Sequence, residues 1–82
     1  MGDFVGMDEK RGLIGLKLIR KDRGLNQLKV ALDLNISREA LSHYENGKRS
    51  PDVQMLRELS RYFNVSIDYL VNGEDFSKNE RK

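Results

Sequence analysis

The sequence predicts an all-α fold, a compact domain of five short helices without strands. Apolar residues recur at helical spacing in five consecutive stretches, and most stretches lie between a capping residue and a glycine or asparagine that can end a helix. The chain has 82 residues, of which 38% are hydrophobic, so it can form one domain with a small core. We expect this domain at residues 12–73, between flexible extensions at 1–11 and 74–82.

The first two helices are indicated by apolar spacing. One is expected from about Leu13 to Arg23 and ended by Gly24, with a buried stripe formed by Leu13, Leu16 and Ile19. The next follows Asn26, which can cap it, and its buried positions should be Val30, Ala31 and Leu34. Asn35 then supplies a sharp turn, because asparagine tolerates the left-handed conformation better than any residue except glycine.

Three further helices are expected after this turn. Ser37 caps a third helix, which ends at Asn46-Gly47 and faces inward with Ala40, Leu41 and Tyr44. Ser50-Pro51, a cap followed by a first-turn proline, predicts the start of a fourth helix that buries Leu56, Leu59 and Phe63. Val65-Ser66 opens a short fifth helix, which ends at Asn72-Gly73 and holds Ile67 and Leu70.

Composition excludes several classes of protein. The absence of cysteine rules out a disulfide framework and thiolate zinc sites, and it is compatible with a reducing cytoplasm. No apolar run is long enough to span a bilayer, and the N-terminus lacks the pattern of a signal peptide. One histidine, no glycine-rich phosphate loop and no nucleophile–base pair argue against an enzyme. We therefore expect a cytoplasmic protein with no catalytic residue, metal, cofactor or membrane partner.

The net charge of +2 conceals an uneven distribution. Residues 10–23 carry six basic side chains against one acid, whereas residues 52–75 carry five acids against two arginines. This asymmetry is typical of a protein that binds a polyanion with one side. It is equally compatible with ordinary solvated helix faces, and charge alone does not decide between the two interpretations.

Four short motifs connect the chain with a known family. They are L-N-Q at Leu25–Gln27, Ala31 four residues after Gln27, Y-E-N-G-K at Tyr44–Lys48 and N-V-S-I-D-Y-L at Asn64–Leu70. With these motifs in this order and spacing, residues 12–73 resemble the Cro/C1-type (lambda-repressor-like, XRE family) helix-turn-helix domain of phage repressors and bacterial regulators. The resemblance implies that the second and third helices bind a double-stranded DNA operator, and that the domain does so as a symmetric homodimer.

The resemblance also implies which residues contact DNA. Gln27, at the first turn of the supporting helix, would hydrogen-bond a phosphate and brace the recognition helix. Four side chains of the recognition helix match base-reading positions: Arg38, Glu39, Ser42 and His43. Their exposure follows independently from helical spacing, since they fall away from the apolar face together with Ser37, which is also a candidate for contact with DNA. The residues that match contacts to the sugar-phosphate backbone are Asn46, Lys48 and Arg49.

Side-chain chemistry suggests what the recognition helix could read. Arg38 can pair with guanine, and Glu39 can accept a hydrogen bond from the amino group of cytosine. The two neighbours could instead neutralise each other, leaving Glu39 to discriminate by repelling phosphates at wrong positions. His43 is the only histidine and has no second histidine or cysteine as a co-ligand, so a hydrogen bond to a base or phosphate is a better interpretation than a metal site.

Other positions are implied to have structural or assembly roles. The resemblance pairs Arg20 with Glu45 inside the domain, so that Glu45 does not face DNA. A dimer contact is expected near the fourth and fifth helices, with Ile67, Tyr69 and Val71 as candidates. The most direct hypothesis is a sequence-specific DNA-binding transcriptional regulator of the repressor type.

Two leucines depart from the family pattern. Leu28 and Leu32 occupy positions of the supporting helix that are usually polar, and their spacing makes an apolar strip. They either pack on the first helix or form a contact surface for another protein. The second interpretation supports an alternative function, a protein-interaction module of the antitoxin or antirepressor-binding kind, with surface anchors at Leu28, Leu32, Tyr62 and Tyr69.

Overall fold

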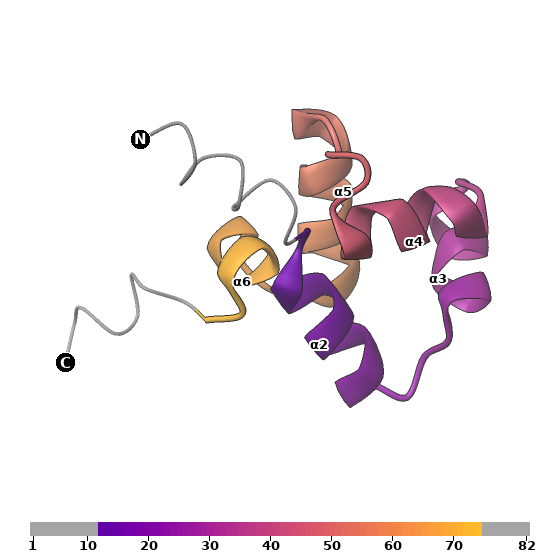
Figure 1. Ribbon diagram of the computed structural model, residues 1–82. Helices are drawn as coiled ribbons and strands as arrows, with labels where there is room; N and C mark the ends of the chain where they lie inside the picture. Colours follow the sequence, from indigo (N-terminus) through magenta and orange to yellow (C-terminus); the bar gives the residue numbers. More distant parts are fainter. Residues whose placement is uncertain (1–11, 75–82) are drawn as a thin grey trace, which may run out of the picture.

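A computed structural model describes residues 12–74, and within this range it contains five helices and no strand. The helices are α2 (Ile14–Asp22), α3 (Gln27–Leu34), α4 (Arg38–Asn46), α5 (Val53–Phe63) and α6 (Ile67–Asn72). Figure 1 shows α3 and α4 together at one side of the domain, α6 at the opposite side, and α2 between them. The predicted all-α class is confirmed, and the extensions expected at 1–11 and 74–82 lie outside the described residues, apart from residue 74.

Local signals set most helix ends. The side chains of Asn26, Ser37 and Ser66 each accept a hydrogen bond from the backbone N–H three residues later, as N-caps do. Asn35 ends α3 in the left-handed conformation, with φ of 61°, and Asn64 ends α5 in the same way, with φ of 57°. The three caps and the turn at Asn35 confirm the predictions, whereas the role of Asn64 was not predicted.

The predicted start of the fourth helix is wrong by two residues. Asp52, and not Ser50, caps α5 by accepting a hydrogen bond from the N–H of Met55 at 2.8 Å. Pro51 therefore precedes the helix instead of occupying its first turn. A carboxylate is a good acceptor at this position, because the N-terminal end of a helix carries a partial positive charge.

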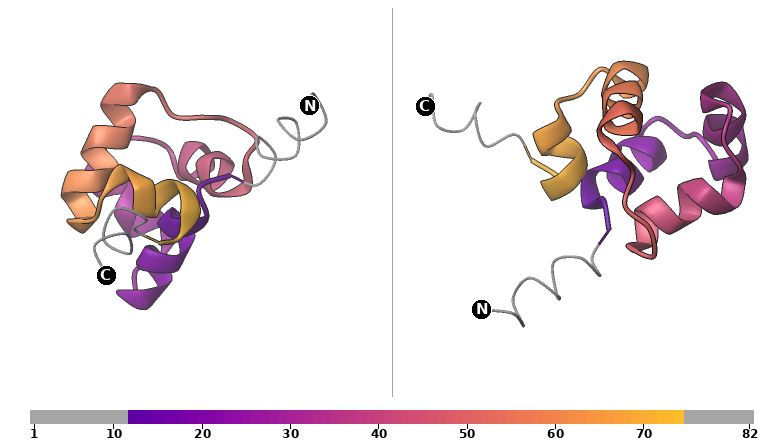
Figure 2. Two further views of the ribbon diagram at one scale, coloured as in Figure 1. Left: turned by 90° about the vertical axis from the view of Figure 1, so that its left-hand side faces the viewer. Right: turned by 90° about the horizontal axis from the view of Figure 1, so that it is seen from above.

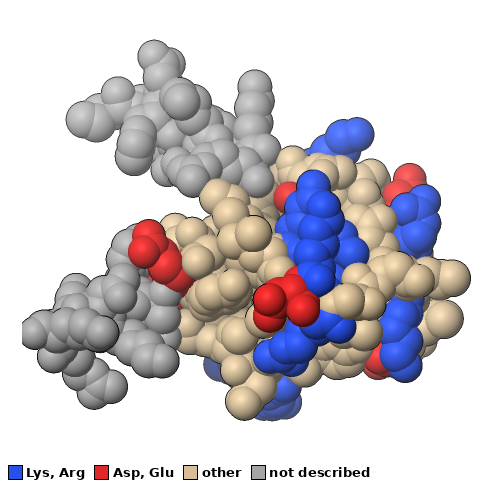
Figure 3. Space-filling model, turned by 90° about the horizontal axis from the view of Figure 1, so that it is seen from below, with Lys and Arg blue, Asp and Glu red and all other residues tan. Residues whose placement is uncertain are grey.

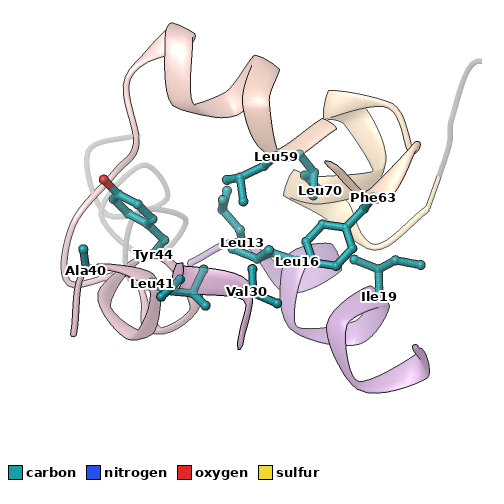
Figure 4. Packing of buried hydrophobic residues seen from close by; sticks show 11 residues of the cluster. Leu13, Leu16, Ile19, Val30, Ala40, Leu41, Tyr44, Leu59, Phe63 and Leu70 are labelled. Carbon is teal, nitrogen blue, oxygen red and sulfur yellow. The ribbon is translucent and has the colours of Figure 1, made fainter. Parts of the chain in front are cut away.

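The core lies where the five described helices meet. Its fully buried side chains are Leu16, Val30, Leu41, Leu59, Phe63 and Leu70, and Figure 4 shows core side chains from different helices pointing toward one another. The expected core positions Leu34 and Leu56 are only partly buried at the edge of this cluster. Ile67 was also expected in the fifth helix's apolar face, but it is exposed.

Gly15 sets how closely α2 approaches α6. A Cβ atom at this position would lie 1.7 Å from the backbone carbonyl oxygen of Tyr69. Such a contact is impossible, so the two backbones can meet here only because residue 15 has no side chain. Figure 2 shows α6 lying directly against α2 in both views. The sequence offered no local signal for this contact.

Candidate DNA interface

The two helices α3 and α4 form a helix-turn-helix. After the left-handed Asn35, the N–H of Ile36 donates to the carbonyl of Ala31 at 3.0 Å, which closes the turn. Ala40, Leu41 and Tyr44 then hold the inner face of α4 in the core. The opposite face of α4 is consequently fixed in position while it remains open to solvent.

The residues predicted to read bases all lie on this outer face. Arg38 and Glu39 are exposed, and Ser42 and His43 are half-buried. Within residues 12–74, Arg38 and Glu39 do not pair with each other: Oε2 of Glu39 lies 4.0 Å from Nε2 of His43 instead. Ser42 accepts a hydrogen bond from Asn46 Nδ2 at 3.3 Å, which links two further polar residues of the same face.

A buried ion pair connects α2 with the end of α4. Arg20 donates from Nε to Glu45 Oε2 at 2.6 Å and from Nη2 to Glu45 Oε1 at 3.1 Å. A third donor of the guanidinium, Nη1, bonds the carbonyl of Leu25 at 2.9 Å. The side chains of Arg20 and Glu45 are only 9% and 1% exposed, so this pair is internal, as the resemblance implied.

Gln27 extends this pair to the surface. Its Nε2 donates to Glu45 Oε1 at 3.0 Å, and its Oε1 accepts from Arg38 Nη1 at 3.1 Å. Since a carboxylate can only accept, Glu45 forces the amide nitrogen inward and the amide oxygen toward Arg38. The family resemblance implied a bond from Gln27 to a phosphate. In the free protein Gln27 instead has two internal partners, with one amide hydrogen left over.

The loop after α4 is held close to the helix end. The carbonyl of His43 accepts hydrogen bonds from the N–H groups of Gly47, Lys48 and Arg49 at 2.9, 3.0 and 3.3 Å. Gly47 allows this close return because its φ of +85° lies in the left-handed region. The guanidinium of Arg49 lies 5.8 Å from the ring centre of Tyr44, within cation–π range. Both exposed cations, Lys48 and Arg49, therefore project from a fixed loop.

The hydroxyl group of Ser37, at the start of α4, can act as acceptor and donor at the same time. Its hydroxyl oxygen caps the helix by accepting from the N–H of Ala40 at 3.0 Å. The hydroxyl can still donate its proton outward, because a hydroxyl is both donor and acceptor. The cap does not conflict with the predicted contact to DNA.

The basic side chains that precede α3 differ in their surroundings: two have internal partners and two are exposed to solvent. Arg20 is buried with Glu45, and Arg23 donates from Nη2 to the carbonyl of Phe63 at 2.7 Å, at the C-terminal end of α5. Lys17 and Lys21 remain exposed on α2. In Figure 3, Lys and Arg side chains lie over the middle and right of the face seen from below, with acidic side chains among them, and a further acidic side chain lies at the left, toward α6.

A second polar link joins α3 to α5. The hydroxyl of Tyr62 donates to Asp33 Oδ2 at 2.6 Å, and Lys29 Nζ lies 3.3 Å from the other oxygen of Asp33. The bond to Asp33 raises the pKa of Tyr62 to about 12, because it stabilises the protonated phenol, and the same bond lowers the pKa of Asp33. Tyr62 is therefore not the free surface anchor that the interaction-module hypothesis assumed.

The remaining predicted surface residues differ in exposure. Leu28 and Leu32 are 53% and 69% exposed, which excludes the interpretation that they pack on the first helix. On α6, Ile67 and Val71 are exposed, whereas Tyr69 is half-buried against the core. In residues 12–74 there is no cluster of His, Asp and Glu that could hold a metal ion. None of the described helices is long and apolar enough to cross a membrane.

Comparison with known proteins agrees with this geometry. A family model described as helix-turn-helix matches residues 16–70. The HTH-type transcriptional regulator ImmR of Bacillus subtilis (strain 168) is 43% identical over 77% of this chain and 50% of its own length. The HTH-type transcriptional activator BcrR of Enterococcus faecalis is 38% identical over 73% of this chain and 29% of its own.

A third relative is named as an antitoxin and not as a transcriptional regulator. Antitoxin PezA of Streptococcus pneumoniae serotype 4 is 42% identical over 73% of this chain and 37% of its own length. The chain thus spans about half the length of these curated relatives, or less. The chain belongs to the Cro/C1-type helix-turn-helix family, a family of DNA-binding transcriptional regulators and not of enzymes.

Proposed function

We propose that this protein binds a specific double-stranded operator as a homodimer and represses transcription in the cytoplasm. One observation carries the proposal: a helix of major-groove size presents Arg38, Glu39, Ser42 and His43 outward while its inner face is locked in the core. Lys48 and Arg49, on the adjoining loop, are placed to contact phosphates and supply affinity without sequence choice.

The geometry around Gln27 supports Arg38 as the principal base-reading residue. A long, exposed arginine has many rotamers, and the hydrogen bond that Arg38 donates to Gln27 restricts them before DNA arrives. A guanidinium held in this way can present two parallel donors to the O6 and N7 atoms of guanine. Gln27 then acts as a positioning residue, and its spare amide hydrogen remains available for a phosphate.

Selection of binding sites from random duplex DNA, followed by two variants, tests this division of roles. Arg38→Ala should weaken binding to the selected site by about 1–3 kcal/mol and relax the preference at one base pair. Lys48→Ala should weaken binding to all duplexes alike and flatten the dependence on salt. Equal behaviour of the two variants across the selected pool would contradict the assignment.

The dimer is proposed to form through α6. Ile67 and Val71 are its exposed apolar residues on the described surface, and Tyr69 lies half-buried between them in sequence. Two domains related by a two-fold axis would place their recognition helices about 34 Å apart, matching half-sites one helical turn apart. Sedimentation of the protein–operator complex measures the stoichiometry, and Val71→Glu should reduce it from two chains to one per operator.

A protein-interaction module is the second candidate function. It is supported by the exposure of Leu28 and Leu32, which form an apolar strip on α3 away from the core, and by the similarity to antitoxin PezA. If this function dominates, Leu28→Glu should abolish binding to a partner protein while Arg38→Ala has no effect. The opposite result, with DNA binding lost in Arg38→Ala alone, favours the regulator.

A further inference from the structure

The basic side chains of α2 and of its C-cap Arg23 fall into two groups, those with internal hydrogen-bond acceptors and those exposed to solvent. Arg20 and Arg23 are committed to internal acceptors, the carboxylate of Glu45 and the carbonyl of Phe63. Lys17 and Lys21 are one helical turn apart on the same side of α2, both exposed, and no acid within residues 12–74 pairs with them. Two solvated cations on one face of a helix can attract an anion together.

These lysines border a groove between α2 and the C-terminal end of α4. The groove has a volume of about 430 Å³ and is lined by Ile14, Lys17, Leu18, Lys21, Glu45 and Asn46. Glu45 does not oppose an anion there, because its carboxylate is already bound by Arg20 and Gln27. Leu18, which is exposed, gives the groove an apolar wall beside the two cations.

We infer that this α2–α4 groove holds a segment of the DNA sugar-phosphate backbone, with Lys17 and Lys21 on a phosphate and Leu18 against a deoxyribose. The inference rests on the proposed DNA-binding function and extends its contact area from the helix-turn-helix to α2. Asn46 supplies the continuity, since it belongs both to the outer face of α4 and to the groove. The pairing of cations with an apolar wall fits a sugar-phosphate chain, which alternates charged and largely apolar units.

The salt dependence of operator binding tests this inference. Each phosphate neutralised contributes about 0.9 to the slope of log K against log salt, and the proposed homodimer has two such grooves with one phosphate each, so Lys17→Ala/Lys21→Ala should make the slope shallower by about 1.8. Between 50 and 200 mM salt, the variant should then lose about 12-fold less affinity than the unmodified protein. Its ranking of operator variants should stay unchanged, because phosphate contacts carry no sequence information.

Two control variants separate local contact from net charge. Arg57→Ala/Arg61→Ala removes the same two charges from exposed positions on α5, away from the groove, and should leave most of the slope intact. Lys17→Arg/Lys21→Arg keeps both charges and should retain the slope. All four replaced residues are exposed, so circular dichroism should show a folded domain in each variant.

The outcomes distinguish this inference from the function on which it rests. If the unmodified protein does not prefer its selected site over a scrambled duplex, the proposed function itself fails. If it does prefer that site, but Lys17→Ala/Lys21→Ala keeps the original slope or changes it no more than Arg57→Ala/Arg61→Ala does, the groove does not contact the DNA backbone. A slope reduced only by the α2 variant supports the inference.

Discussion

Replacing Arg20 by methionine should destabilise the domain severely. Methionine keeps most of the length and volume of the arginine stem but removes the three donors that bind Glu45 and Leu25. Glu45, only 1% exposed, is then left as a buried carboxylate with a single hydrogen bond from Gln27. Breaking a buried pair in this way costs about 3–5 kcal/mol.

The cost in this domain should lie toward the lower end, about 3 kcal/mol, because Gln27 continues to donate to the carboxylate. For a domain of this size, 1 kcal/mol corresponds to roughly 4–8 °C in the midpoint of thermal unfolding, so Arg20→Met should lower the midpoint by about 12–24 °C. Urea unfolding followed by circular dichroism gives the free energy directly, and thermal unfolding checks it independently.

A double-mutant cycle tests the physical reason. Glu45→Met alone should also be strongly destabilising, because it strands the guanidinium of Arg20. The double variant Arg20→Met/Glu45→Met buries no charge and should be more stable than either single variant, at a remaining cost of about 1 kcal/mol for the acceptor that Gln27 loses. A cost below about 1 kcal/mol for Arg20→Met, or additive costs in the double variant, would refute the reasoning.

Three further predictions concern other contacts. Gly15→Ala should cost at least about 3 kcal/mol, measured by urea unfolding, because its Cβ would collide with the backbone carbonyl of Tyr69 and separate α2 from α6. Asp33→Asn should return the pKa of Tyr62 from about 12 toward its ordinary value of 10, measured by absorbance titration against Tyr62→Phe as the blank. Since the pKa of Tyr62 is raised on folding, the stability it contributes is present below pH 10 and lost between pH 10 and about 12. A Tyr62→Phe variant should lack this alkaline loss in urea unfolding. Leu32→Glu, at an exposed position, should change stability by less than about 0.5 kcal/mol in the same assay.

The features that sequence predicted correctly depend on neighbouring residues alone. Asn26 and Ser37 cap helices through bonds spanning three residues, and Asn35 turns the chain through its own backbone preference. Helical spacing likewise separates the buried Leu41 from the exposed Arg38. These properties do not depend on distant parts of the chain, so the sequence pattern and the conformational propensities of the residues suffice to predict them.

The features that were missed require knowledge of distant residues. The contact of Gly15 with α6 and the bond of Tyr62 to Asp33 join positions far apart in the chain, and neither residue type indicates its partner. Arg23 appeared to belong to a basic patch until the end of α5 was placed beside it. The choice of Asp52 over Ser50 is of another kind, because both are good caps and Pro51 suits the first turn after Ser50. In the structure, the N–H of Met55 donates to Asp52, so that α5 begins after it.

Stability and recognition cannot be separated in a domain this small. Glu45 has one oxygen that accepts hydrogen bonds from both Arg20 and Gln27. The bond to Glu45 fixes the orientation of the Gln27 amide, whose oxygen in turn accepts a hydrogen bond from Arg38. The orientation of a surface arginine is thereby set by an ion pair in the interior. Large proteins can support a binding residue with a separate layer of surrounding side chains, but here the same three side chains hold α2 to α4 and orient Arg38, the residue proposed to read a base. A substitution that weakens the interior pair should therefore alter base preference as well as stability, even though neither Arg20 nor Glu45 lies on the outer face of α4.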